Sequence, residues 1–303
     1  MRTLVTGALP LTEGERARLE ALGLEIVLHP DERAPVEGPE TYEAAVCNGL
    51  FQYADHRAFS RLRFVQLTSA GMDRVPVEAL RARGVRVSNA AGVYAVPMAE
   101  WTVMALLELC RNAPFFHGNQ RLRRWEKDRG LWELSGRRAC ILGFGAYGRE
   151  TARRLGAFGV ERIVAARTPY RGELAEGYVP LSRLDQVLPQ ADILILALAL
   201  APETEGILDE RRLRLLRPTA LVVNAARGGL VDQEALIRAL SEGRIRGAAL
   251  DVFQREPLPP ESPLWDLPGV LVFPHNAFAG EGTHRRLFQQ IYDRFKGWSV
   301  ERC

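Results

Sequence analysis

The chain of 303 residues is 47% hydrophobic and 25% charged, a composition typical of a globular protein, and its length predicts two domains. Its formal net charge of +3 is too small and too dispersed to predict a nucleic-acid-binding surface. No apolar run reaches membrane-spanning length and no signal peptide precedes the first predicted strand, so we expect a cytoplasmic protein.

The four cysteines, Cys47, Cys110, Cys140 and Cys303, have spacings that fit neither a zinc site nor a redox pair. Cys47 and Cys140 lie in apolar, strand-like runs, where a thiol usually acts as a small buried hydrophobic group. The sequence therefore predicts no metal site and a reducing compartment.

The first ninety residues alternate short strands and helices. Thr12 and Glu15 form a capping-box pattern ahead of a helix that ends near Leu22, before Gly23. Strands are predicted at 2–6, 24–28, 44–47, 63–67 and 85–88. Such an alternation predicts a parallel sheet covered by helices.

A long apolar helix is predicted over 97–113, with Pro97 in its first turn, and 114–135 is expected to cross the surface toward the next domain. A second alternation starts at Arg138. It predicts strands and then helices over these ranges: strands at 138–142, 161–166, 192–198, 220–224, 246–250 and 270–273, and helices at about 147–158, 182–188, 209–216 and 232–241. The arginine-rich run 211–217 is interpreted as the solvated face of an amphipathic helix.

A final helix at about 283–297 follows a turn at 274–282 and has no strand of its own, so we expect it to pack on the first domain. The predicted fold is α/β, with two doubly wound parallel-sheet domains. A Rossmann-type cofactor domain, 93–278, is inserted in a discontinuous, flavodoxin-like substrate domain made of 1–92 and 279–303.

A glycine fingerprint, Gly143-x-Gly145-x-x-Gly148, stands between the strand 138–142 and the helix that follows it. This context predicts a site for the pyrophosphate of a dinucleotide. Gly143 allows the tight turn, Gly145 lets the backbone approach the phosphates, and Gly148 lets the helix pack against the strand. The helix start, at Ala146 and Tyr147, supplies amide donors and the positive end of the helix dipole.

The end of the second strand of this domain distinguishes the two nicotinamide cofactors. An Asp or Glu at this point would bind a ribose 2′-hydroxyl, but the sequence has Arg167 and Thr168, followed by Arg171. A guanidinium pairs with a 2′-phosphate, so we expect NADP(H), with NAD(H) possible. The alternative is that Arg167 is one more arginine in a chain whose 40 basic residues include only two lysines.

Three polar residues, Arg227, Glu256 and His275, follow predicted strands of the second domain. Ligands of open parallel sheets bind at the carboxyl ends of strands, so these residues could converge on one crevice. Each alone has a simpler explanation, as a solvated loop charge or a structural histidine.

Together with the glycine fingerprint, several motifs between about Val65 and Ala279 resemble the D-isomer-specific 2-hydroxyacid dehydrogenase family. They are Ser-Ala-Gly-Met-Asp at 69–73, Val-Pro-Met-Ala-Glu at 96–100, Pro-Glu-Thr-Glu-Gly-Ile at 202–207 and Pro-Pro-Glu-Ser-Pro-Leu-Trp at 259–265. The family's Arg–Glu–His set matches Arg227, Glu256 and His275. The resemblance also implies that amides around Ala70 and Gly71 hold the substrate carboxylate, that Asp251 contacts the nicotinamide carboxamide, that Ala225 lies at the cofactor, and that the protein is a homodimer.

Reduction of a 2-oxo acid needs a hydride at the carbonyl carbon and a proton at the carbonyl oxygen. Histidine normally titrates near neutral pH, so His275 is the expected acid, and its neutral ring the base in the reverse reaction. Glu256 at the other ring nitrogen would fix the tautomer and favour the imidazolium form. Arg227 would pair with the substrate carboxylate and polarise the carbonyl.

The sequence leaves the acid itself open. The run after His275 departs from the family's small residues with Asn276 and Phe278, and Leu-Ala-Leu-Ala stands at 198–201 where the family has Leu-Pro-Leu-Thr. Candidate pocket walls at 48–51, Met72 and Phe278 favour a short acid such as glyoxylate or hydroxypyruvate over a phosphorylated one. The chain ends soon after its last helix, which we interpret as evidence against an allosteric phosphoglycerate dehydrogenase.

A second class of function remains open, because the same fold also serves nucleotide-sensing corepressors and scaffolds with little turnover. The Arg227, Glu256 and His275 set argues against this alternative, since a binding protein does not need an acid–base pair.

Overall fold

The computed structural model describes residues 1–300, without side-chain detail for the last two, and Cys303 lies outside the described residues. The chain forms two compact units. The first consists of Met1–Tyr94 and the segment that starts at Gly280, and the second of Ala95–Ala279.

The first unit contains a parallel sheet in the order β2-β1-β3-β4-β5. Its strands are β1 (Arg2–Thr6), β2 (Glu25–His29), β3 (Ala44–Cys47), β4 (Phe64–Leu67) and β5 (Arg86–Ser88). This is the flavodoxin-like strand order, in which the direction of winding reverses between β1 and β3. The predicted fold class is confirmed for this unit.

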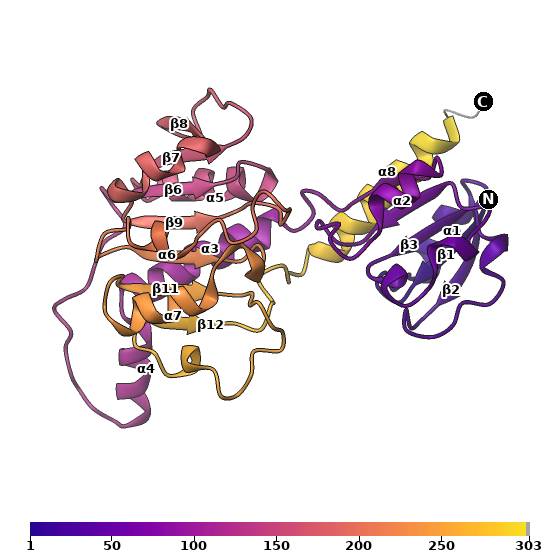
Figure 1. Cartoon of the computed structure of the whole chain (residues 1–303). Helices are drawn as coiled ribbons and strands as arrows, with labels where there is room; N and C mark the ends of the chain where they lie inside the picture. The colour runs from indigo at the N-terminus through magenta and orange to yellow at the C-terminus, as the bar shows by residue number, and fades with distance from the viewer. Residues whose placement is uncertain (301–303) are drawn as a thin grey trace. The chain divides into compact units, whose positions relative to one another are not determined.

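Three helices cover the sheet of the first unit: α1 (Glu13–Glu20), α2 (Val77–Ala82) and α8 (Thr283–Val300). The predicted capping box of α1 is present, with Thr12 and Glu15 bonded to each other's backbone. Although α8 comes from the far end of the chain, it lies on the N-terminal sheet (Figure 1), and its Phe295 packs edge-on to Phe64 with ring centroids 5.3 Å apart.

The second unit contains a seven-stranded parallel sheet in the order β12-β11-β10-β9-β6-β7-β8, visible as a stack in Figure 1. Its strands are β6 (Arg138–Leu142), β7 (Glu161–Ala166), β8 (Gly177–Pro180), β9 (Ile193–Leu196), β10 (Leu221–Asn224), β11 (Gly247–Leu250) and β12 (Val270–Val272). Winding reverses between β6 and β9, as in the Rossmann order, which confirms the fold class here too. We predicted six of these strands. The short edge strand β8 was missed because Gly177 and Pro180 read as a loop.

The helices of the second unit are α3 (Ala95–Cys110), α4 (Ala113–Arg121), α5 (Ala146–Ala157), α6 (Glu210–Leu213) and α7 (Gln233–Ser241). The helix predicted over 97–113 begins earlier, at Ala95, and ends earlier, at Cys110, because the backbone turns at Asn112, whose φ is +48°, and a new helix begins. The surface segment 114–135 therefore starts inside α4. The segment predicted as a helix over 182–188 is mainly the 3-10 helix Leu181–Gln186.

The arginine-rich run 211–217 is helical only at its start, so the predicted helix over 209–216 was too long. Arg211 and Arg212 both pair with Asp185, at 2.6 and 2.9 Å, and Arg214 pairs with Glu210 at 2.5 Å. The run is thus a network of ion pairs.

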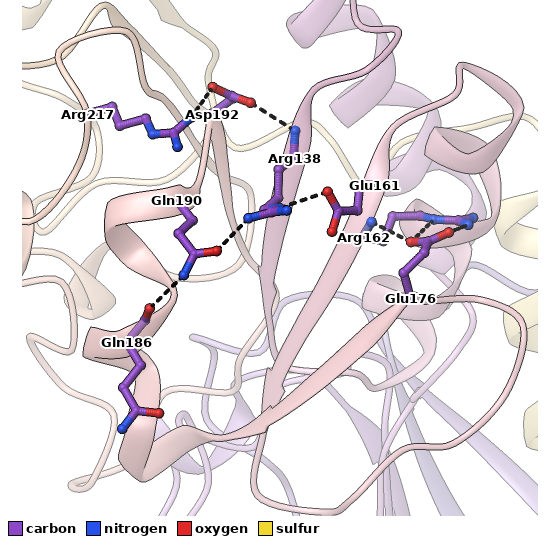
Figure 2. Close-up of polar contacts among 8 residues, drawn as sticks. All are labelled: Arg138, Glu161, Arg162, Glu176, Gln186, Gln190, Asp192 and Arg217. Atoms are coloured by element: carbon purple, nitrogen blue, oxygen red, sulfur yellow. Dashed lines mark hydrogen bonds and ion pairs between the residues drawn. The ribbon is translucent and has the colours of Figure 1, made fainter.

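The amino ends of the strands in the second sheet are joined by a polar network (Figure 2). Arg138, which begins β6, places Nε 2.8 Å from Glu161 Oε2, and its backbone amide donates to Asp192 Oδ2 over 3.0 Å. Arg217 donates to Asp192 Oδ1 at 3.2 Å, and Gln190 accepts from Arg138 Nη1 at 2.5 Å. The charged side chains at this edge are paired with one another. We therefore expect a ligand at the opposite edge of the sheet, where the strands have their carboxyl ends.

We predict that Phe295→Ala lowers the free energy of unfolding of the first unit by about 3–5 kcal/mol, because it leaves a cavity between α8 and the sheet. Phe295 is fully buried, whereas Leu28 of the same unit is 50% exposed and provides the control Leu28→Ala. Urea unfolding followed by circular dichroism measures both variants. A loss for Phe295→Ala no larger than that of the control would contradict the packing of α8 described above.

Candidate active site

The glycine fingerprint forms the loop between β6 and α5. Gly143 has a φ of +93°, and a side chain there would place Cβ 2.5 Å from the Ala197 carbonyl oxygen. A Cβ at Gly148 would lie 2.3 Å from the Gly143 carbonyl oxygen, but a Cβ at Gly145 would meet nothing within 4 Å. The loop therefore leaves open space at the middle glycine, at the start of α5 and beside the point where the sheet reverses. This arrangement fits a dinucleotide pyrophosphate.

The end of β7 presents Arg167 and Thr168, both exposed. Within residues 1–300 the Arg167 guanidinium has no hydrogen-bond or ion-pair partner. Tyr147, at the start of α5, bonds through its hydroxyl to Thr102 Oγ1 of α3 at 2.7 Å. The Tyr147 side chain is therefore held by α3. If Tyr147 contacts a cofactor, the contact would be made by its backbone amide.

His275 and Glu256 form a close pair near the carboxyl ends of β11 and β12. His275 Nδ1 lies 2.7 Å from Glu256 Oε2, and the two side chains are 30% and 33% exposed. The other carboxylate oxygen, Glu256 Oε1, accepts from the Phe253 amide at 3.0 Å. Glu256 is thus fixed by backbone on one side and orients the imidazole on the other, which leaves His275 Nε2 for another partner.

His275 stands in a left-handed turn, with a φ of +52°. Asp251 stabilises the turn through two hydrogen bonds. Its Oδ1 accepts from the Asn276 amide and its Oδ2 from the Ala277 amide, each at 2.8 Å. Asp251 is buried at the end of β11, and this burial raises the pKa of its carboxyl, against the effect of the two amide donors. Phe278 lies edge-on to the His275 ring, with centroids 6.1 Å apart.

Arg227 follows β10 in a loop packed tightly against the segment that carries Glu256. A Cβ at Gly228 would lie 2.0 Å from the Phe253 carbonyl oxygen, so only glycine permits this approach. Asn224 Nδ2 donates to the Arg227 carbonyl at 2.9 Å, and Arg227 Nη1 donates to the Ala226 carbonyl at 2.8 Å. The loop that carries Arg227 is therefore packed directly against the loop that carries Glu256.

In the first unit, the loop after β4 contains Ala70 and Gly71. Its carbonyls are bonded within the protein: Ser69 O accepts from the Ala90 amide at 2.9 Å, Ala70 O from Asn89 Nδ2 at 2.6 Å, and Gly71 O from Ser69 Oγ at 2.7 Å. Within residues 1–300 the amides of Ala70 and Gly71 have no acceptor. These two amides are therefore available to a ligand that accepts hydrogen bonds.

Comparison with known proteins identifies the family to which these features belong. The model of the D-isomer specific 2-hydroxyacid dehydrogenase NAD binding domain matches residues 103–277. The chain belongs to this family. It is 32% identical over 298 residues to a glyoxylate reductase/hydroxypyruvate reductase of Mus musculus, covering 94% of this chain and 90% of the mouse protein.

Two further relatives extend the comparison. A D-3-phosphoglycerate dehydrogenase of Methanocaldococcus jannaschii is 34% identical over 241 residues, which are 78% of this chain but only 45% of that protein. An NADPH-dependent glyoxylate/hydroxypyruvate reductase of Sinorhizobium meliloti, solved with NADP and malonate, is 30% identical, with a TM-score of 0.82 and coverage of 98% and 93% of the two chains. This chain is accordingly a D-2-hydroxyacid dehydrogenase with a nicotinamide cofactor.

The dehydrogenase assembles most of the expected site residues along one edge of its second sheet. Gly143, Gly145, Ala146, Gly148, Arg167 and Thr168 lie at the ends of β6 and β7, and Ala225, Arg227, Asp251, Glu256 and His275 follow β10, β11 and β12. Ala70 and Gly71 belong to the first unit. Sequence reasoning missed the Phe253 amide and the two amides bound by Asp251. The only sequence signal for the latter was a lone aspartate at the end of an apolar strand.

Neither a metal-binding cluster nor a helix able to cross a membrane occurs among residues 1–300.

We predict that Gly145→Ala keeps the stability of the dehydrogenase but weakens NADPH binding by at least about tenfold, because the added methyl group enters the space expected for the phosphates. Gly148→Ala is the matched contrast. Its Cβ would collide with backbone, so it should lower the free energy of unfolding by about 1–3 kcal/mol. Fluorescence titration with NADPH and urea unfolding separate the two effects. Unchanged NADPH affinity in Gly145→Ala would contradict this assignment of the loop.

Proposed function

We propose that this dehydrogenase reduces a short 2-oxo acid to the D-2-hydroxy acid with NADPH, using His275 as the acid, Glu256 as its partner and Arg227 as an electrophilic clamp. The observation that carries the proposal is the 2.7 Å contact between His275 Nδ1 and Glu256, at the same sheet edge as the open glycine loop. The reverse reaction uses the same groups, with the neutral imidazole as base.

The proton step follows from which ring nitrogen is engaged. Because Glu256 holds Nδ1, the proton that leaves His275 is the one on Nε2, and it goes to the carbonyl oxygen of the substrate. The negative charge of Glu256 stabilises the imidazolium before transfer, and the Phe253 amide keeps the carboxylate in place. When bound, the nicotinamide cofactor supplies the hydride to the carbonyl carbon.

Two sets of groups would hold the substrate. The free amides of Ala70 and Gly71 would bind one face of its carboxylate, and the Arg227 guanidinium would pair with the carboxylate and polarise the carbonyl. In this proposal the first unit is the substrate domain and the second the cofactor domain. Asp251 would accept from the nicotinamide carboxamide as well as from its two amides, since each carboxylate oxygen has a second lone pair.

The preference for NADPH rests on the unpaired Arg167 guanidinium beside Thr168, with Arg171 close along the chain. A cation there attracts a 2′-phosphate, and the residues directly after β7, where a carboxylate would bind a 2′-hydroxyl, are Arg167 and Thr168. The S. meliloti relative is described as NADPH-dependent, which agrees with this choice.

Steady-state kinetics with glyoxylate, hydroxypyruvate and pyruvate, each with NADPH and with NADH, test the proposal. Turnover of glyoxylate or hydroxypyruvate with NADPH is expected. The alternative function, a nucleotide-sensing corepressor or scaffold, would be favoured if NADPH bound but none of these acids were reduced. The complete His275–Glu256 pair favours the enzyme.

We further propose a homodimer in the cytoplasm. Most of the apolar face of α3 is buried in its own unit, but Met104, Phe116, Leu122 and Trp125 are exposed, and Trp125 is 95% exposed. Such large apolar side chains favour a protein interface. The free thiols of Cys47, Cys110 and Cys140 fit a reducing compartment.

We predict that Glu256→Gln lowers kcat for reduction by about 10²- to 10⁴-fold, because the imidazolium loses its charge partner and its fixed orientation. NADPH affinity should not change. Glu261→Gln, an exposed carboxylate in the same loop, is the control. A kcat for Glu256→Gln equal to that of the control would exclude the proposed role.

Cofactor selection gives a separate prediction. Arg167→Asp should raise the Kd for NADPH by at least about tenfold, since a carboxylate repels the 2′-phosphate, and should leave the Kd for NADH nearly unchanged. Arg129→Asp makes the same charge change at another exposed position and is the control. Equal weakening of both cofactors by Arg167→Asp would show that Arg167 does not read the 2′ position.

A further inference from the structure

Glu32 of the first unit binds the protein's own backbone in the manner of an anionic ligand. Its Oε1 accepts from the Asn48 amide at 2.6 Å and from Thr6 Oγ1 at 2.7 Å, and its Oε2 accepts from the Gly49 amide at 2.7 Å. Thr6 is fully buried. Two successive amides and a buried hydroxyl thus converge on one carboxylate, which is the donor set of an anion site.

The Glu32 carboxylate lies where a ligand is expected to bind in a sheet of this kind. Thr6 ends β1, and Asn48 and Gly49 directly follow β3, so Glu32 lies at the carboxyl ends of the two strands between which the sheet reverses. In flavodoxin-like sheets this is the point where a ligand binds. The next strand, β4, pairs Leu67 with Cys47 and leads into the loop of Ala70 and Gly71. Neighbouring strands lie about 5 Å apart, so the two loops that carry these amides leave the sheet at adjacent points of its edge.

These contacts have two consequences for a molecule held at Ala70 and Gly71. The amides of Asn48 and Gly49 are already engaged, so they cannot bind a second anionic group of a substrate. The Glu32 charge also repels such a group. Asn48 Oδ1 is buried and has no donor within residues 1–300, so the Asn48 side chain adds another acceptor to this loop.

We infer that Glu32 is a specificity-determining residue, an internal carboxylate that excludes 2-oxo acids with a second anionic group and restricts the enzyme to monoanionic ones. The inference rests on the proposed function, because it assumes that the substrate carboxylate binds at Ala70 and Gly71. It explains why a chain with a phosphoglycerate dehydrogenase among its relatives would favour a short, unphosphorylated acid.

The test compares kcat/KM for hydroxypyruvate, 3-phosphohydroxypyruvate and oxaloacetate with NADPH in the wild type and three variants. Glu32→Gln removes the charge and keeps the size of the side chain. Thr6→Val removes one donor to Glu32 and keeps the charge. Glu37→Gln makes the same charge change at an exposed position in the same loop. Melting temperatures show that each variant is folded.

Glu32→Gln should raise the ratio of kcat/KM for each dianionic or phosphorylated acid to that for hydroxypyruvate by about tenfold. Glu37→Gln and Thr6→Val should leave the ratio near that of the wild type. In the wild type, added KCl should reduce the difference in kcat/KM between hydroxypyruvate and the acids with a second anionic group, because salt screens the repulsion between Glu32 and that group. This second measurement applies even where Glu32→Gln is unstable.

Three results would overturn the inference: an unchanged ratio in Glu32→Gln, an equal rise in Thr6→Val, or a wild-type difference in kcat/KM that KCl does not alter. The last result alone decides the case where Glu32→Gln does not fold. Failure of the proposed function itself looks different, because then the wild type reduces none of the acids, hydroxypyruvate included.

Discussion

A buried carboxylate, Asp251, holds the turn on which the candidate active site depends. Its two oxygens take up the amides of Asn276 and Ala277 and thereby fix the left-handed backbone at His275. A residue with a side chain adopts this conformation only where surrounding contacts enforce it. Those contacts set the direction of the imidazole, and Glu256 then completes its orientation through Nδ1. Burial raises the pKa of the Asp251 carboxyl, and the two amide donors act in the opposite direction.

Polar groups at the amino ends of the strands are bonded within the protein, whereas some groups at the carboxyl ends are available to a ligand. In the second unit, polar contacts around Arg138 and Asp192 join the strands at the amino edge (Figure 2). The carboxyl edge has an exposed Arg167 and open space at Gly145. In the first unit, the Ala70 and Gly71 amides have no acceptor among residues 1–300, whereas Glu32 occupies the amides of Asn48 and Gly49 after the neighbouring strand. We therefore propose that the choice of cofactor and of acid depends on which backbone amides are available to a ligand, as well as on side chains.

Much of this was predictable from the sequence, because periodicity and glycine spacing are local. The apolar strand runs, the capping box at Thr12 and the fingerprint from Gly143 to Gly148 all depend on neighbours in the chain. The edge strand β8 was missed because Gly177 and Pro180 carry a loop signal, and the helix end at Asn112 was missed although an asparagine followed by Pro114 is a helix-ending signal. The contacts of Asp251 and Glu32 join residues 16 to 26 positions apart, which no local pattern encodes.

The central proposal is that the turn held by Asp251 directs His275 Nε2 at the carbonyl of a bound 2-oxo acid, and that the amides of Ala70 and Gly71 bind the carboxylate of this acid. A crystal structure of the complex with NADP and oxamate, an unreactive analogue of a short 2-oxo acid, tests it most directly. The account predicts the oxamate carboxylate on those two amides and its carbonyl oxygen about 3 Å from His275 Nε2. An oxamate bound with its carboxylate elsewhere, or an imidazole with Nε2 turned to solvent, would contradict it.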